Sequence, residues 1–223
     1  RGKGSLTYQA RKKAFIYRVG YPQKSGEATI TNILHSAAHS APLAKLTIEK
    51  EIFYIPAFNG AFVEQKIFIG ENRQGIGNVL CLKDIPVGTE IYNIERNPGD
   101  GGKMIRTAGS AATILKHLEN GSVIVLMPNK NEVILHEKCR ATIGRIAGDG
   151  RMLKTFVKAG KKHYKMKAKN KLWPRTSAVK VNAVDHPFGS GRGKRIKPKI
   201  AQRNAPAGRK VGHLRPRRTG WRK

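Results

Sequence analysis

The chain has 223 residues and carries 44 Lys and Arg against 14 Asp and Glu, a formal net charge of +30 at pH 7. An excess of that size destabilises a compact protein by self-repulsion unless an anionic partner surrounds it, so we expect a polyanion as the partner. No apolar run approaches the roughly 18 residues of a membrane span, and the basic N-terminus lacks the apolar segment of a signal peptide. We therefore expect a soluble protein of the cytoplasm.

The positive charge lies at the two ends of the chain. Residues 1–24 hold 7 basic and no acidic side chains, residues 25–150 hold 13 of each, and residues 151–223 hold 24 basic side chains and one acidic. This distribution predicts a neutral globular core with two cationic arms, which become ordered only when they meet phosphate. The alternative is that the arms are solvated, disordered tails, because blocks of like charge stay disordered without a partner.

The N-terminal arm, residues 1–24, is rich in Gly, Lys, Arg and Tyr and has no sustained period, so we expect an extended segment. Basic side chains along it are the candidates for phosphate contact. They are Arg1, Lys3, Arg11, Lys12 and Lys13.

Residues 25–84 are predicted to form a first β unit. Its strand-like runs are separated by turn residues and occupy residues 28–33, 44–49, 51–55, 61–69 and 79–82. Five short strands suggest a small barrel. The dipeptide Asn59-Gly60 is typical of a tight hairpin turn, because both turn positions require positive φ. It predicts that residues 51–55 pair with residues 61–69.

Residues 85–157 are predicted to form a second β unit, which begins at the turn-rich residues 85–89. Strand-like runs occupy residues 89–94, 104–107, 111–118, 122–127, 132–135 and 141–147. Asn120-Gly121 and residues 128–131 are predicted to be tight connections, and the glycine-rich residues 97–102 a longer loop. Turn signals at this spacing are typical of sandwiches and barrels.

Residues 158–223 form a basic extension. Residues 158–170 contain enough Lys, Ala and Met for a short helix, on which Lys161, Lys165 and Lys169 are spaced by four along one face. Like charges at this spacing repel, so the helix needs an anion along that face. It is expected to end before Pro174. Beyond it the chain has no periodic apolar face and is predicted to be irregular.

Rings stand beside cations in the extension, at Trp173 and Arg175, at Phe188, and at Trp221. Proteins use this combination to meet splayed nucleobases as well as phosphates. The alternative is that Trp173 and Phe188 pack onto the β units.

Residues 181–195 contain three alternating glycines, Gly189, Gly191 and Gly193. Glycine permits strained turns and close approach of the backbone to a partner. The cations in and after this stretch are Arg192, Lys194, Arg195 and Lys197. The combination predicts a loop pressed against phosphate. It is not a Walker motif, because Arg195 stands where Ser or Thr is required and Pro198 disfavours the following helix.

This glycine loop resembles the signature loop of the universal large-subunit ribosomal protein two family. Further matches to the family extend along nearly the whole chain. They are Gly2-Lys3-Gly4-Ser5, Ala41-Pro42-Leu43-Ala44, Pro98-Gly99-Asp100, Ala205-Pro206-Ala207-Gly208-Arg209-Lys210-Val211-Gly212 and Arg217-Arg218-Thr219-Gly220. Phe188 and both ends of the chain resemble the archaeal and eukaryotic cytosolic branch.

The resemblance implies a mainly β fold, with an oligonucleotide-binding-type barrel followed by an SH3-like barrel and basic arms. It implies a structural constituent of the large ribosomal subunit that is a monomer within the ribosome. Its implied partners are ribosomal RNA and neighbouring ribosomal proteins, and its role is in subunit assembly and association. The family's Asp-His pair, matched by Asp185 and His186, implies support of the peptidyl-transferase region. The tail residues that would bind RNA include Arg209, Lys210, Arg215, Arg217 and Arg218.

One loop departs from the family pattern. Where the archaeal and eukaryotic branch usually has Pro-Gly-Arg-Gly, this chain has Ala37-Ala38-His39-Ser40, which removes an expected cation from the loop.

The sequence gives little indication of a catalytic site or of a cofactor-binding site. Adjacent side chains such as Asp185 and His186 point to opposite sides of an extended segment, and no nucleophile is indicated by spacing, so we expect no enzyme. An RNA-modifying enzyme would need a cofactor pocket that the sequence does not indicate. A non-ribosomal nucleic-acid chaperone would share the charge but would not need the shaped glycine loop.

Metal ligands are equally sparse. His136 and Cys139 make one close pair, whereas structural zinc sites usually need two. Cys81 and Cys139 are far apart in the sequence and lie in apolar runs, so we expect buried, reduced thiols. The alternative is a disulfide between them. No protein-bound cofactor is expected, and magnesium is expected to accompany the bound RNA.

Overall fold

The computed structural model describes residues 14, 16–71, 73–191, 200–201 and 203–212. The chain divides into two compact units, Arg1–Lys171 and Leu172–Lys223, which are described separately. The expected mainly β architecture is confirmed. Its elements, in chain order, are β1 (Gly26–Leu34), β2 (Leu43–Ile48), β3 (Glu51–Pro56), β4 (Lys66–Ile69), β5 (Val79–Cys81), η3 (Leu82–Asp84), β6 (Glu90–Tyr92), β7 (Ala112–Leu118), β8 (Ser122–Leu126), β9 (Glu132–His136), β10 (Arg140–Ile143), η4 (Asp149–Met152), α1 (Ala159–Ala168) and η5 (Ala178–Lys180).

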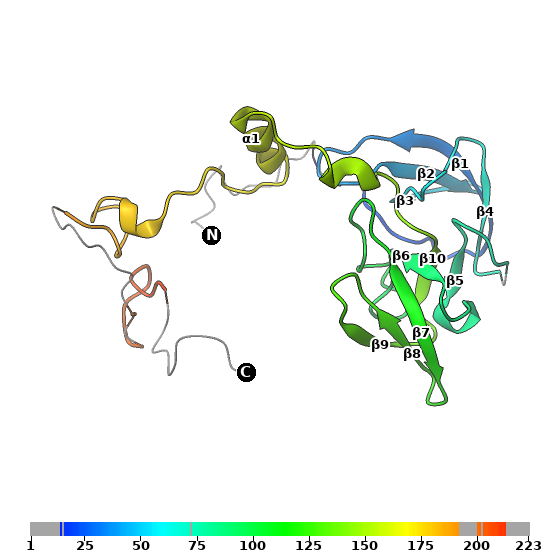
Figure 1. Ribbon diagram of the computed structural model, residues 1–223. Helices are drawn as coiled ribbons and strands as arrows, with labels where there is room; N and C mark the ends of the chain where they lie inside the picture. The colour runs from blue at the N-terminus through cyan, green and yellow to red at the C-terminus, as the bar shows by residue number, and fades with distance from the viewer. Residues whose placement is uncertain (1–13, 15, 72, 192–199, 202, 213–223) are drawn as a thin grey trace. The chain divides into compact units, whose positions relative to one another are not determined.

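Ten described strands form one hydrogen-bonded sheet in the order β3-β2-β1-β4-β5-β10-β6-β7-β8-β9. All neighbouring pairs are antiparallel except β4 and β5. Figure 1 shows β1 to β4 grouped at one end of the first unit and β7 to β9 at the other, with β5, β6 and β10 between them.

The sheet encloses two apolar cores. The first includes Ile30, Leu46 and Ile67, which are fully buried, and also takes Tyr92 and Ile146 from later in the chain. The second is formed by residues between Leu80 and Ile143. Each core thus draws side chains from both sides of the predicted division at residues 84 and 85. That division, and the types of the two barrels, stay predictions.

The predicted hairpin across Asn59-Gly60 is wrong. A turn is present, with Gly60 at a φ of +88°, but β3 has β2 as its only partner among the described strands, and β4 pairs with β1 and β5. The chain leaves β3 because Phe58, 2% exposed, enters the first core and forms a bridge to Ile146. Residues 61–65 are consequently not strand, and only the end of the predicted run 61–69 becomes β4.

Two other predicted strands are shortened by backbone that leaves the extended region. Residues 104–107 contribute only an isolated bridge between Met104 and Ile94, because Ile105 has a φ of +51°. The run 141–147 ends as β10 at Ile143, before Gly144 at a φ of +112°. Local turns fare better, since Gly121 at +72° and Lys130 at +64° make the two predicted tight connections between β7, β8 and β9.

Outside the sheet, the chain follows the expected pattern. The predicted helix at residues 158–170 is present as α1. In the described part of the second unit, the only regular element is the single 3₁₀ turn η5, and the rest is irregular. No helix among the described residues is long and apolar enough to cross a membrane.

Removing a core side chain should cost far more stability than removing an exposed one of the same type. Ile67 in β4 is 0% exposed, whereas Ile134 in β9 is 65% exposed. We expect Ile67→Ala to lower the free energy of unfolding by about 2–5 kcal/mol and Ile134→Ala to change it by less than about 0.5 kcal/mol. Urea unfolding followed by circular dichroism measures both; equal losses would contradict the assignment of the first core.

Candidate nucleic-acid interface

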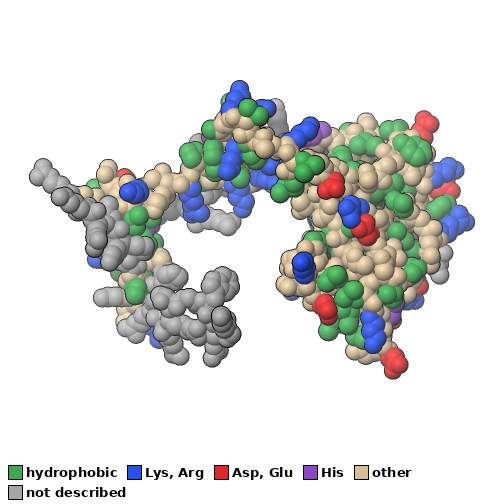
Figure 2. All heavy atoms as spheres, in the orientation of Figure 1, with side chains coloured by type: hydrophobic (Ala, Val, Ile, Leu, Met, Phe, Trp, Pro, Cys, Tyr) green, Lys and Arg blue, Asp and Glu red, His purple; other side chains and the backbone are tan. Residues whose placement is uncertain are grey.

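The cationic side chains of the first unit are not spread evenly. Figure 2 shows Lys and Arg gathered around α1, whereas the β body carries Lys, Arg, Asp and Glu side by side. This matches the sequence, in which residues 25–150 are neutral and basic residues dominate after residue 150. We therefore expect the nucleic-acid interface on the basic arms, and the β body fixes where those arms begin.

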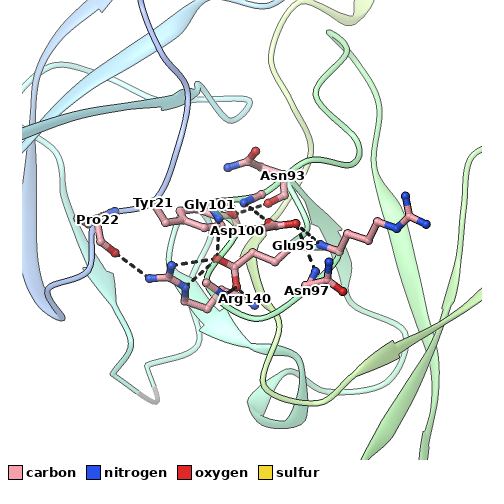
Figure 3. A network of polar contacts seen from close by, with 12 residues as sticks. Tyr21, Pro22, Asn93, Glu95, Asn97, Asp100, Gly101 and Arg140 are labelled. Atoms are coloured by element: carbon pink, nitrogen blue, oxygen red, sulfur yellow. Dashed lines mark hydrogen bonds and ion pairs between the residues drawn. The ribbon is translucent and has the colours of Figure 1, made fainter.

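The base of the N-terminal arm is held by a buried network of polar contacts (Figure 3). At its centre, the carboxylate of Glu95 is 0% exposed and pairs with Arg140, whose Nη2 donates to Oε1 at 2.9 Å. The carboxylate also accepts hydrogen bonds from the backbone N–H groups of Gly99 at 3.2 Å, Gly101 at 3.0 Å and Arg140 at 2.9 Å. One buried acid thus holds both β10 and the glycine-rich loop 97–102.

The same network grips the backbone of the arm. Arg140 Nη1 donates to the carbonyl of Pro22 at 2.8 Å, and Arg106 Nη2 donates to the carbonyl of Val19 at 3.2 Å. Between them, the Tyr21 hydroxyl donates to the carbonyl of Asn93 at 2.7 Å. Burial raises the pKa of Tyr21 far above its usual value, so this phenol stays protonated and remains a donor. The arm therefore leaves the body from a fixed starting point.

The loop at residues 97–102 is shaped by its glycines and by Asp100. The Asp100 carboxylate accepts hydrogen bonds from the backbone N–H groups of Arg96 at 3.1 Å and Gly102 at 2.9 Å. A Cβ on Gly102 would lie 2.3 Å from the carbonyl oxygen of Asn93, at a φ of +80° that already disfavours other residues. The loop was expected from the sequence, but its anchor Glu95 was not.

The loop at residues 37–40, where an expected cation is missing, is used inside the protein. His39 is half-buried, and its Nδ1 lies 2.8 Å from the Ser36 hydroxyl. Burial and the nearby Arg106 guanidinium lower the pKa of His39, so the ring is neutral at pH 7. Ser40 accepts a hydrogen bond from the backbone N–H of Ala108 at 3.1 Å. The contact between Ser40 and Ala108 holds the loop against the β body. Because His39 is neutral, the loop carries no positive charge.

The lysines of α1 lie as their spacing predicts but differ in environment. Lys161 is exposed, whereas Lys165 and Lys169 are half-buried. The ammonium of Lys165 lies 4.7 Å from the centre of the Phe156 ring. The pKa of Lys169 is lowered, mainly by burial and to a smaller extent by the charges of Arg151 and Lys165. Lys165 and Lys169 are thus brought together, and Arg151, which the sequence did not single out, joins them.

In the second unit, the loop at residues 181–191 turns on itself rather than running extended. The backbone N–H groups of Asp185 and His186 both donate to the carbonyl of Asn182. His186 Nδ1 accepts from the backbone N–H of Phe188 at 3.0 Å, and the two rings meet edge to face at 5.1 Å. We expected Asp185 and His186 to point to opposite sides because their segment would be extended. The segment is a turn, so that reason is wrong. Phe188, rather than Asp185, orients the imidazole.

The glycines of this loop have different roles from the ones expected. Neither Gly189 nor Gly191 has a left-handed φ. Gly189 is required by close packing, because a Cβ there would lie 2.2 Å from the carbonyl oxygen of Asn182. A Cβ on Gly191 would meet none of the described residues within 4 Å.

A second segment of this unit closes against the loop. Phe188 and Arg209 line one cavity of about 320 Å³, together with residues such as Asn204 and Pro206. Arg209 and Lys210 are exposed, as is Arg175, while Trp173 is half-buried. Flat and cationic groups are thus brought together in the way expected of an RNA-contacting segment.

The other predicted site residues lie outside the described part of the chain. They are Arg1, Lys3, Arg11, Lys12, Lys13, Arg192, Lys194, Arg195, Lys197, Arg215, Arg217 and Arg218.

The two cysteines are free thiols. Cys139 is buried, as expected, and burial raises its pKa to about 11. Cys81 is half-buried rather than fully buried, and burial also raises its pKa. Among the described residues, no three His, Cys, Asp or Glu side chains gather as metal ligands would.

Comparison with known proteins gives consistent matches. The family model described as Ribosomal Proteins L2, C-terminal domain, matches residues 75–208. The chain is 43% identical over 229 residues to the large ribosomal subunit protein uL2 of Archaeoglobus fulgidus, covering 100% of this chain and 96% of the relative. It is equally similar to proteins of the same name from Methanococcoides burtonii, with 96% of the relative covered, and Methanococcus maripaludis, with 95% covered.

The buried pair at the base of the arm should matter far more to stability than an exposed pair. Glu95→Gln leaves the Arg140 guanidinium, 16% exposed, without its counter-charge, so we expect a loss of about 3–5 kcal/mol in the free energy of unfolding. Glu90→Gln removes a pair that is 44% and 46% exposed, and we expect a loss below about 1 kcal/mol. Chemical unfolding of the two variants compares them, and a loss in Glu95→Gln no larger than in Glu90→Gln would refute the anchor.

Proposed function

Because the chain belongs to the L2 family of ribosomal proteins and to its archaeal type, we propose that it is a structural component of the large ribosomal subunit, not an enzyme. The observation that carries this proposal is the similarity along the whole chain to proteins named large ribosomal subunit protein uL2. Its place is then the ribosome in the cytoplasm, where it acts as a monomer. Its partners are ribosomal RNA and neighbouring ribosomal proteins.

The neutral body and the basic segments divide the work. The body folds around its two apolar cores and fixes where the N-terminal arm begins, through the contacts of Arg140 and Arg106 with the arm backbone. The basic segments neutralise RNA phosphates and release counterions, which supplies most of the affinity. Magnesium accompanies the RNA phosphates rather than a protein cage.

The glycine loop supports the peptidyl-transferase region by position. His186 Nδ1 accepts a hydrogen bond from the N–H of Phe188, which leaves Nε2 as the ring nitrogen that can donate. An imidazole held in this way can donate one hydrogen bond to RNA. In the described loop the partner of His186 Nδ1 is the backbone N–H of Phe188 rather than the Asp185 carboxylate, which supports positioning of RNA as the role of Asp185 and His186.

RNA affinity should depend steeply on salt, and the second unit should account for much of that dependence. Removing residues 172–223 deletes 15 basic side chains, and each phosphate contact adds roughly 0.7–0.9 to the slope of log K against log salt. We expect the shortened protein to bind large-subunit ribosomal RNA with a slope several units flatter. Filter binding at several salt concentrations measures the slope. An unchanged slope would contradict the proposal that the basic segments, rather than the β body, neutralise the RNA phosphates.

Replacing His186 should separate positioning from proton transfer. A general acid or base typically contributes about 10²-fold or more. His186→Gln keeps a hydrogen-bonding group that cannot titrate, so we expect large subunits that assemble normally and form peptide bonds within about tenfold of the unmodified rate. The readout is peptide-bond formation per purified subunit.

Gly189→Val serves as the contrasting variant. Its side chain would collide with the Asn182 backbone, so we expect a low yield of mature subunits rather than a slow reaction. Normal assembly together with a large per-particle defect in His186→Gln alone would overturn the positional role.

A further inference from the structure

Arg151 has an unusual environment for a cation. It lies in η4, just after the sheet ends, and its Nε is buried without a hydrogen-bond partner among the described residues. Within the described part of the chain, its Nη2 contacts the sulfur of Met152, at 3.7 Å. A buried N–H without an acceptor is costly, so such a donor points to an acceptor supplied from outside the protein.

Lys165 and Lys169 bring two more positive charges to the same place. They lie four residues apart, and the N–H of Lys169 donates to the carbonyl of Lys165 at 3.3 Å, so both side chains share one face of α1. The Phe156 ring, from the segment between η4 and α1, holds the Lys165 ammonium at 4.7 Å. Burial and the nearby charge of Arg151 both lower the pKa of Lys169. None of the three forms an ion pair with a described carboxylate.

The helix that carries these lysines has little to stabilise it from within. α1 has 10 residues, no side-chain cap at Lys158, no acidic residue in its first turn and no buried residue. A helix of this length is marginal in water without tertiary packing, and repulsion between lysines four apart weakens it further. Its order therefore depends on whatever neutralises that face.

We propose that one phosphate of the RNA backbone binds between Arg151, Lys165 and Lys169 and fixes α1 beside η4. The guanidinium supplies Nε–H to the phosphate oxygens, as arginine forks commonly do, and the two ammonium groups supply point charges. This inference rests on the proposed function, because the phosphate belongs to ribosomal RNA. It goes further in two ways. Folding of α1 depends on the binding of one anion, and Arg151, a residue outside the helix, is one of the groups that bind it.

Hydrogen exchange of the α1 backbone amides in the full chain tests the site, with mass spectrometry as the readout. The ligands are a transcript of large-subunit ribosomal RNA and, separately, inorganic phosphate against chloride at equal ionic strength. The variants are Arg151→Gln, Arg151→Lys and Lys169→Gln. Lys167→Gln is the matched control, because Lys167 is exposed on the same last turn of α1 but points away from Lys165 and Lys169.

We expect RNA to slow exchange in α1 by about tenfold or more in the unmodified chain and in Lys167→Gln. The slowing should fall below about twofold in Arg151→Gln and Lys169→Gln. Arg151→Lys should also lose it, because lysine keeps the charge but has no Nε–H fork. An unchanged urea midpoint would confirm that the variants fold.

Each other outcome overturns a defined part of the account. If Lys167→Gln loses the slowing as well, total charge rather than a site orders the helix. If inorganic phosphate alone gives the full effect and RNA adds nothing, the ligand is a free anion. If RNA binds with its full affinity and α1 stays unprotected, the site is refuted and the proposed function stands; if RNA does not bind, the proposed function fails first.

Discussion

The buried carboxylate of Glu95 is the constraint on which the rest of the molecule depends. Five N–H groups converge on its two oxygens, from the loop at Gly99 and Gly101 and from the backbone and guanidinium of Arg140. A charge that is fully removed from water is tolerated only when it is paired and hydrogen-bonded in this way. Because Arg140 also holds the carbonyl of Pro22, the pair that completes the body also fixes the start of a cationic arm.

This arrangement reconciles a stable fold with a charge of +30. The acidic residues lie almost entirely in residues 25–150, where they balance an equal number of cations and leave the two apolar cores free of net repulsion. Many of the surplus cations lie on segments outside the two cores, such as α1, in which no residue is buried. Under the proposed function, bound phosphate would relieve the repulsion among them, and folding of these segments would be coupled to RNA binding.

What the sequence could predict was local. The Asn120-Gly121 turn and the lysine spacing of α1 are properties of neighbouring residues, and both are found. The pairing of β3 was predicted wrongly because the choice of partner is decided by Phe58 meeting Ile146, far away in the chain. Glu95 carried one signal that could have been used, since it directly follows Ile94 of a strand-like run and precedes a glycine-rich loop, and an acid drawn into a core there has to be paired. Nothing local identifies Arg140 as its partner.

Crosslinking in living cells, followed by sequencing of the attached RNA and identification of the attached peptides, tests the central claim most directly. If a neutral body presents basic segments to ribosomal RNA, crosslinks should fall at a few fixed positions of large-subunit RNA. On the protein they should lie in residues 1–24 and 151–223 rather than on β7, β8 and β9. Crosslinks scattered over many cellular RNAs, or concentrated on those three strands, would contradict it.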